Sequence, residues 1–236
     1  MSTPSDVLAA MLRSDPGRPR VTCYDDTPGA TQGERIELSA KVLANWVSKA
    51  GNALQEEWDL GPGATIRLAL PPHWRSLYWA LAAWSVGATV VLDDAPCDLL
   101  VTDDPTLLDP DAAAPSVLVT LAGLARSAPG GAPAGTMDEA RELSTYADQL
   151  TAWDEAAPTD PALRADGADT AYENVVPQRD WPNEARVHTA SDSLVDVLAD
   201  ALGAWALDGS LVLSRGPEPA GGRSARLESE GVTVAL

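Results

Sequence analysis

Apolar positions in the first half of the chain follow two periods in turn. Residues 40–58 are rich in helix-forming side chains and carry apolar residues at spacings of three and four, which predicts a helix with one face turned to a core. Gly61-Pro62-Gly63 then leads into a short apolar run over 65–70, a second predicted helix over 74–86 and a second run over 88–92. Strand, helix and strand joined by short Gly and Pro turns are typical of a parallel β-α-β unit.

Weaker patterns place further elements before and after this unit. Predicted strands cover residues 20–24, 35–38, 98–102, 117–121, 186–189, 210–214 and 232–236. Predicted helices cover residues 5–12 with Ser5 as cap, 138–155 with Leu150 and Trp153 buried, and a stretch from Ser191 or Asp192 to Leu207. The turn residues from Asp25 to Gly29 predict a hairpin between the first two strands, and residues 128–136 predict a glycine-rich loop.

No internal repeat and no clean linker interrupts these elements. We therefore predict a single α/β domain over residues 1–236, built on a mostly parallel sheet with helices on both faces. A parallel sheet needs that cover because its strands are apolar on both sides. The least regular segment is 158–185, where only 162–163 and 171–172 suggest short strands.

Composition narrows the classes of partner. Hydrophobic residues make up 45% of the 236 residues, enough for a sizeable core. The formal net charge of −19 disfavours nucleic acid and anionic membrane surfaces, which such a field repels. No apolar run approaches the ~18 residues that a membrane span needs. We expect no nucleic-acid partner and no membrane association.

The thiols and the first residues of the chain bear on localisation. Met1 to Asp15 shows no basic region followed by an apolar core, so the sequence predicts no secretory signal. Cys23 and Cys97 are then expected to be reduced thiols. These features favour a cytoplasmic protein.

Two groups of side chains deserve comparison as metal ligands. His73 and His188 lie far apart with no neighbouring ligand pattern, which favours structural roles over ligation. Five carboxylates follow successive predicted strands and could face a Mg or Ca ion at one sheet edge: Asp93, Asp94, Asp98, Asp103 and Asp104. A solvated acidic rim is the favoured interpretation, because the whole chain is acidic, so we assign no metal.

Several motifs together resemble a known family. Glu37-Leu38-Ser39 before a helix, Gly61 to Ile66 before a strand, Leu70-Pro71 after it and Gly87-Ala88 at the next helix end resemble the N-terminal region of adenylate-forming enzymes, the acyl-CoA synthetase or AMP-binding group. Later elements from Arg186 to Leu213 and from Glu230 to Thr233 also resemble it. The resemblance covers most of the chain, is most specific over residues 37–92, and implies the α/β fold of that region.

The resemblance also indicates where nucleotide phosphates would bind. Enzymes of this family activate a carboxylate with ATP and Mg to an acyl-adenylate, gripping the phosphates with a Ser/Thr/Gly-rich loop that ends in lysine. Thr159 to Leu163 resembles the lead-in to that loop, and a degenerate loop then follows: Arg164, Asp166, Gly167, Asp169 and Thr170. Carboxylates at this place would repel phosphate, and the segment has no lysine. No catalytic residue is carried over.

Two hypotheses follow for the function. In the first, the chain is a truncated relative, ending before the family's later nucleotide contacts and catalytic lysine domain; it has lost ATP-dependent carboxylate activation and acts as a binding or interaction module without a cofactor. In the second, an acyl- or aryl-adenylating ligase using ATP and Mg is completed by a partner chain or a homodimer mate, with a small carboxylic acid or adenylate as ligand. Sheet edges and apolar helix faces that need cover motivate the second.

Overall fold

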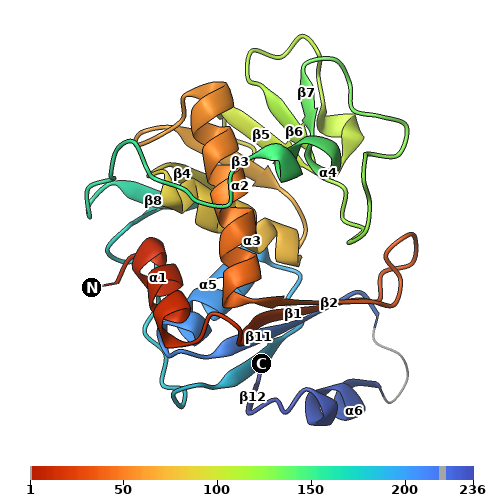
Figure 1. Cartoon of the computed structure of the whole chain (residues 1–236), viewed down its shortest axis with the longest axis vertical. Coiled ribbons are helices and arrows are strands. Elements are labelled where there is room, and N and C mark those ends of the chain that lie inside the picture. Colours follow the sequence, from red (N-terminus) through yellow and green to blue (C-terminus); the bar gives the residue numbers. More distant parts are fainter. Residues whose placement is uncertain (1, 218–221) are drawn as a thin grey trace. The chain divides into compact units, whose positions relative to one another are not determined.

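A computed structural model describes residues 2–217 and 222–236 (Figure 1). The chain divides into two compact units. The first consists of residues 1–43, 71–77 and 176–236, and the second of residues 44–70 and 78–175. The chain passes from one unit to the other within helices α2 (Ala40–Trp58) and α3 (Trp74–Ser85). This division does not test the prediction of a single domain over residues 1–236, which stays a prediction.

The first unit, in its described part, holds a five-stranded sheet in the order β12-β10-β11-β1-β2. Its strands are β1 (Pro19–Asp25), β2 (Glu34–Ser39), β10 (Arg186–Thr189), β11 (Ser210–Arg215) and β12 (Val234–Ala235). Only the β1–β2 hairpin is antiparallel among these pairs. Helix α5 (Leu194–Ala206) packs on β10 and β11 and against α1 (Pro4–Ser14), while α6 (Gly222–Ser229) precedes β12.

The second unit holds a seven-stranded sheet over its residues, in the order β7-β6-β5-β3-β4-β8-β9. The strands are β3 (Thr65–Ala69), β4 (Thr89–Val91), β5 (Leu99–Thr102), β6 (Ser116–Leu118), β7 (Thr136–Asp138), β8 (Pro161–Ala165) and β9 (Ala168–Ala171). Every pair is parallel except β8–β9. Short helical turns are η1 (Pro105–Leu107), α4 (Glu139–Glu142) and η2 (Leu143–Thr145).

The mostly parallel α/β class predicted from the sequence is confirmed, with the strands shared between two sheets. The predicted β-α-β unit is also present, because β3 pairs in parallel with β4, with Ile66 opposite Val90. Both side chains are fully buried, as a strand covered on two faces requires. Gly87 ends this crossover with φ +84°, and a Cβ there would lie 2.8 Å from Pro62 Cγ.

The helix caps differ slightly from those predicted. Thr3, rather than Ser5, caps α1 in a reciprocal arrangement with Asp6. Ser193, rather than Ser191 or Asp192, caps α5 by accepting a hydrogen bond from the Asp196 amide. Sequence alone could not separate these neighbours, because each is a good cap.

The helix predicted over residues 138–155 is wrong. It stops after α4 and η2, and the following segment runs beside α2 without a helix. Three side chains one turn apart on α2 bind its carbonyl groups: Lys49 donates to Tyr146, Asn52 to Ala147 and Gln149, and Gln55 to Thr151. These bonds replace the hydrogen bonds of a helix. Leu150 is consequently half-buried, and Trp153, predicted to be buried, is 58% exposed.

We expect Asn52→Ala to destabilise the fold by about 1–3 kcal/mol, because it removes two donors and leaves two backbone carbonyls unpaired. Urea unfolding would measure the loss. Lys41→Ala, at an exposed position on the same helix, is the matched control and should change little. Equal effects of the two substitutions would contradict the role assigned to Asn52.

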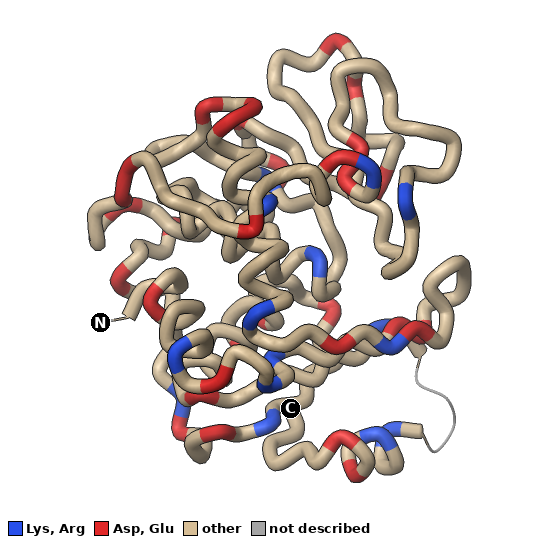
Figure 2. Tube along the Cα trace, in the orientation of Figure 1, with Lys and Arg blue, Asp and Glu red and all other residues tan. Residues whose placement is uncertain are grey.

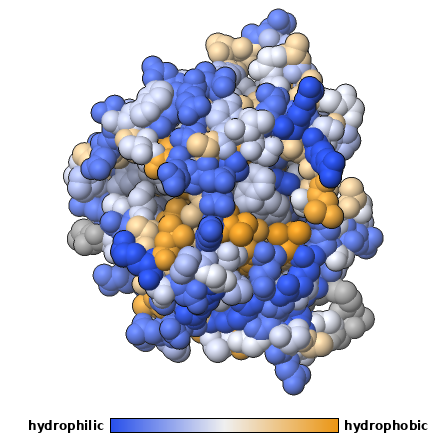
Figure 3. All heavy atoms as spheres, in the orientation of Figure 1, coloured by the Kyte–Doolittle hydropathy of each residue, from blue (hydrophilic) through white to orange (hydrophobic). Residues whose placement is uncertain are grey.

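Charge and hydropathy are unevenly spread. Most of the basic residues belong to the first unit, and the second is strongly acidic (Figure 2). Hydrophilic residues cover most of the face drawn in Figure 3. Among the described residues, no helix is both long enough and apolar enough to cross a membrane.

Candidate functional site

The five residues placed by sequence at the phosphate-loop position all lie in the β8–β9 hairpin of the second unit. Arg164 is on β8, Thr170 is on β9, and Asp169 faces Arg164 across the pair. Asp166 and Gly167 form the two-residue connection with φ of +50° and +74°. Two consecutive positive φ values are typical of a tight type I′ hairpin turn. Whether this hairpin occupies the phosphate position stays a prediction.

The hairpin neutralises its own cation. Arg164 Nε and Nη2 donate to the two carboxylate oxygens of Asp169 at 2.7 and 3.0 Å, a two-pronged ion pair. This pairing raises the pKa of Arg164 and lowers the pKa of Asp169. The Gly167 amide donates to a carboxylate oxygen of Asp93 at 3.2 Å. The arginine of this hairpin and the amide of its glycine are therefore both bound to carboxylates.

The acidic rim after β4 and β5 is held by local bonds. Asp98 accepts hydrogen bonds from the amide and hydroxyl of Thr65 at 2.7 and 2.8 Å. Asp94 forms an ion pair with Arg67, and Asp104 caps η1. Within the described parts of the chain, no group of three or more His, Cys, Asp and Glu side chains could hold a metal ion.

Both histidines are buried in the first unit. His188 lies on β10, where its Nε2 is 3.0 Å from the hydroxyl of Ser214. Burial, reinforced by Arg223 and Arg226, lowers the pKa of His188 to about 4. Burial and the neighbouring Arg75 lower the pKa of His73 to about 3. Both rings are therefore neutral at pH 7 and act as packed polar groups.

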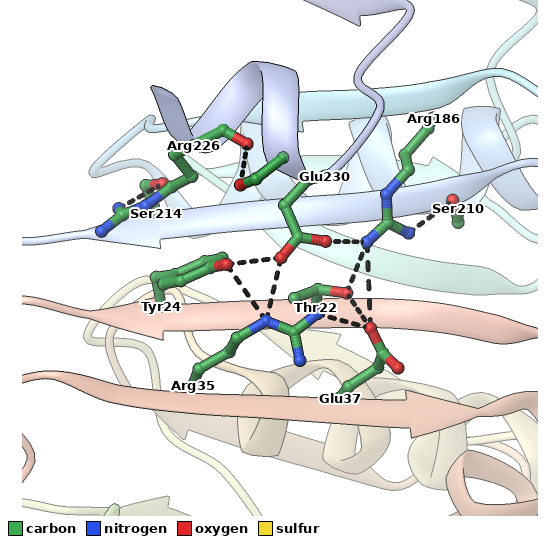
Figure 4. Close-up of polar contacts among 10 residues, drawn as sticks. Thr22, Tyr24, Arg35, Glu37, Arg186, Ser210, Ser214, Arg226 and Glu230 are labelled. Carbon is green, nitrogen blue, oxygen red and sulfur yellow. Dashed lines mark hydrogen bonds and ion pairs between the residues drawn. The ribbon is translucent and has the colours of Figure 1, made fainter. Parts of the chain in front are cut away.

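A polar network that sequence reasoning missed joins the end of α6 to the sheet of the first unit (Figure 4). The carboxylate of Glu230 accepts hydrogen bonds from Tyr24 on β1, from Arg35 Nε on β2 at 2.9 Å, and from Arg186 on β10. Glu37 accepts from Arg35 Nη2 at 2.7 Å. Burial alone would raise the pKa of Glu230, but these donors outweigh it and lower that pKa to about 2.

The same unit contains a polar cavity of about 500 Å³ beyond the carboxyl end of β10. It lies beside the first two turns of α5. Its lining includes Arg179, Ser191, Asp196, Asp200 and Arg223. Sequence reasoning could not find it, because residue 179 precedes β10 and residue 223 follows β11, and no local motif joins them.

Solved structures show what fold these units form. The chain is similar to an acyl-CoA synthetase of Brucella canis, with a TM-score of 0.71 and 15% identity over 99% of this chain and 47% of that one. The N-terminal domain of FACL13 from Mycobacterium tuberculosis has a TM-score of 0.70 and 13% sequence identity, and the match covers 100% of this chain and 62% of that one. Klebsiella oxytoca NpsA, solved in complex with 3-hydroxyanthranilyl-AMSN, has a TM-score of 0.68 and 16% sequence identity, and the match covers 100% of this chain and 47% of that one.

The fold is therefore that of the N-terminal region of acyl-CoA synthetases and related adenylation enzymes, which confirms the predicted resemblance at the level of fold. The chain spans about half the length of the first of these proteins. No protein-family model matches it. It is, however, 34% identical over 259 residues, covering 100% of both chains, to a "TIGR03089 family protein" of Mycobacterium tuberculosis. The chain belongs to the TIGR03089 family.

Proposed function

We propose that this protein is an acyl-CoA synthetase-like binding module that does not activate carboxylates with ATP. The β8–β9 hairpin is the observation that supports the proposal. Its turn has two residues, its arginine is paired with Asp169, and its glycine amide is directed to Asp93. A phosphate cradle needs several free backbone amides and an uncommitted cation.

Charge strengthens the argument. Two unit charges of the same sign 4 Å apart repel by about 1 kcal/mol in water and about 4 kcal/mol near a protein surface. Asp93, Asp166 and Asp169 all belong to or contact this hairpin. The two lysines do not lie near it in sequence, and Lys49 is bonded to the backbone of Ser144 and Tyr146. The hairpin therefore favours repulsion of a nucleotide phosphate.

The test is adenylate formation by the full chain, measured as ATP–pyrophosphate exchange with pools of fatty, aryl and amino acids. We expect no exchange above background. In parallel, a thermal shift assay would use ATP with Mg, AMP, and a non-hydrolysable acyl-adenylate analogue. A ligand at about 100 times its Kd would add about 2.7 kcal/mol of stability, which such an assay detects easily. An unchanged melting temperature would therefore show that the ligand does not bind.

Exchange by the chain alone would overturn the proposal. Exchange that appears only with a co-purifying chain would also overturn it, and would favour an adenylating ligase completed by a partner. Asp169→Asn provides a useful variant, because it releases Arg164 without changing the length of the hairpin. If carboxylates exclude the nucleotide, ATP should stabilise this variant more than the parent chain.

A further inference from the structure

The cavity beyond β10 has the position and size of a ligand site. Its lining is Arg179, Thr189, Ala190, Ser191, Asp196, Asp200, Arg223 and Leu236. Ligands in α/β proteins favour the crevice outside the carboxyl ends of parallel strands. Here β10, β11 and β12 are parallel, and Thr189 is the last residue of β10. A volume of about 500 Å³ lies within the usual range of ligand pockets.

Its charges are of both signs and lie on different elements. Asp196 and Asp200 project from successive turns of α5, while Arg223 comes from α6. Arg179 Nη2 lies 3.0 Å from an Asp200 oxygen. Burial raises the pKa of Asp200, whereas a hydrogen bond from Thr189 and the charge of Arg179 act to lower it. A ligand with charge of a single sign would be attracted by half of this lining and repelled by the other half.

Arg179 is seated by a glycine inside a helix. A Cβ added to Gly203 of α5 would lie 2.6 Å from Arg179 Cγ and 3.4 Å from Trp181 Cζ3. The guanidinium lies 5.0 Å from the centre of the Trp181 ring. Glycine in a helix is less favourable than alanine, but Gly203 leaves room for the aliphatic part of the Arg179 side chain. Arg179 Nε is buried against the helix and makes no hydrogen bond to the described residues.

The opposite wall belongs to the end of the chain. Arg223 Nη2 donates to the Leu236 carbonyl at 2.9 Å, and both residues line the cavity. The intervening Glu230 is fastened to the sheet by Tyr24, Arg35 and Arg186 (Figure 4). One wall is therefore provided by a helix packed on the sheet, and the other by a segment anchored at Glu230.

We propose that this cavity binds a small peptide zwitterion of two or three residues. Its carboxylate would face Arg223, which donates to a backbone carbonyl and not to a side-chain carboxylate. Its ammonium group would face Asp196, which accepts from the Ser191 hydroxyl, while its peptide groups meet the hydroxyls of Thr189 and Ser191. Each end of such a ligand would lie opposite a side chain of the opposite charge. Hydrogen bonds between charged groups are stronger than those between neutral groups. The inference rests on the proposed binding role and gives that role a ligand.

The test uses isothermal titration calorimetry of the full chain, without ATP, against triglycine and two singly charged analogues. One analogue is N-acetylated and the other is amidated at its C-terminus. We expect triglycine to bind and each capped analogue to bind at least tenfold more weakly, since each loses one charged hydrogen bond. No heat with triglycine, or equal binding of all three peptides, would overturn the proposal.

Variants locate the site. Asp196→Asn, at an exposed position, should weaken the binding of triglycine about tenfold or more. Asp192→Asn is the matched control, because it removes an exposed carboxylate that lies outside the lining, four residues earlier in the loop that leads into α5. Loss of binding in both, or in neither, would overturn the assignment. No nucleotide is added in these peptide-binding experiments. A failure of triglycine to bind would therefore not change the outcome of the ATP–pyrophosphate exchange assay.

Tryptic cleavage after Arg223 supplies a second readout, because this exposed side chain lines the cavity. We expect saturating triglycine to slow cleavage there, and the capped peptides to leave its rate unchanged. Unchanged cleavage with triglycine bound would place the peptide elsewhere and contradict the proposal.

Discussion

Glu230→Gln should lower the free energy of unfolding by about 2–3 kcal/mol near neutral pH. The substitution preserves size but replaces a carboxylate that receives hydrogen bonds from Tyr24, Arg35 and Arg186. The Glu230 side chain is only 7% exposed, so water cannot easily replace the lost charge. Two arginines would be left facing a neutral amide, and removing one partner of a buried pair is costly.

The stabilisation by Glu230 should depend on pH, because the pKa of this carboxyl differs between the folded and unfolded chain. The pKa of Glu230 falls from 4.5 to about 2 on folding. Its contribution is therefore fully present above about pH 4.5 and is lost progressively as the pH falls towards 2. Urea unfolding of the parent and the variant should show a large difference at pH 7 and a clearly smaller one at pH 3.

Glu228→Gln is the matched control, because Glu228 is an exposed carboxylate two residues before Glu230, in the last turn of α6. It should change stability little at either pH. A loss of equal size at pH 7 and pH 3, or equal losses from Glu228→Gln and Glu230→Gln, would show that the network does not anchor this segment.

This network also bears on function, because it shows where the cations of an acidic chain are used. Basic side chains that form ion pairs with carboxylates of the chain include Arg18, Arg20, Arg35, Lys49, Arg67, Arg164, Arg179, Arg186, Arg215 and Arg226. The sequence has 16 lysines and arginines against 35 acids. More than half of the cations are therefore already paired with carboxylates of the chain, which is consistent with the proposed binding role without ATP.

Local periodicity explains which parts of the fold were predictable. The β3-α3-β4 unit follows from short apolar runs and a helix between Gly and Pro turns, all within 30 residues or so. Residues 138–155 also have helix-forming composition, but their fate depends on Asn52 and its neighbours on α2, which lie nearly 100 residues earlier. Strand β7 was missed because three residues carry too little pattern.

The candidate sites divide in the same way. The residues of the β8–β9 hairpin could be named because they are contiguous and follow Thr159 to Leu163, which resembles the lead-in to the phosphate loop; their place in a phosphate site stays a prediction. The Glu230 network joins side chains up to 206 residues apart, and nothing near Glu230 in the sequence indicates Tyr24. The cavity depends on a packing detail, the absence of a Cβ at Gly203. Such features require the folded arrangement and cannot be read from spacing.

Gly216→Ala should destabilise the chain by about 2–5 kcal/mol. Gly216 follows β11 with φ +81°, a conformation that costs a residue with a Cβ about 1–2 kcal/mol. A Cβ would also lie 2.5 Å from the amide nitrogen of Thr27 and 2.8 Å from the carbonyl carbon of Asp26. Because these contacts are backbone atoms, relief requires the chain after β1 to move, which adds about 1–3 kcal/mol.

Gly63→Ala separates the two contributions. Gly63 has φ +87°, but nothing lies within 4 Å of an added Cβ. It should therefore lose only the conformational part, about 1–2 kcal/mol. Thermal and urea unfolding of both variants would measure the difference, which reports the backbone contact at Thr27. If the two variants were equally stable, Gly216 would not be held against the turn after β1, and the close packing of β11 on β1 would need revision.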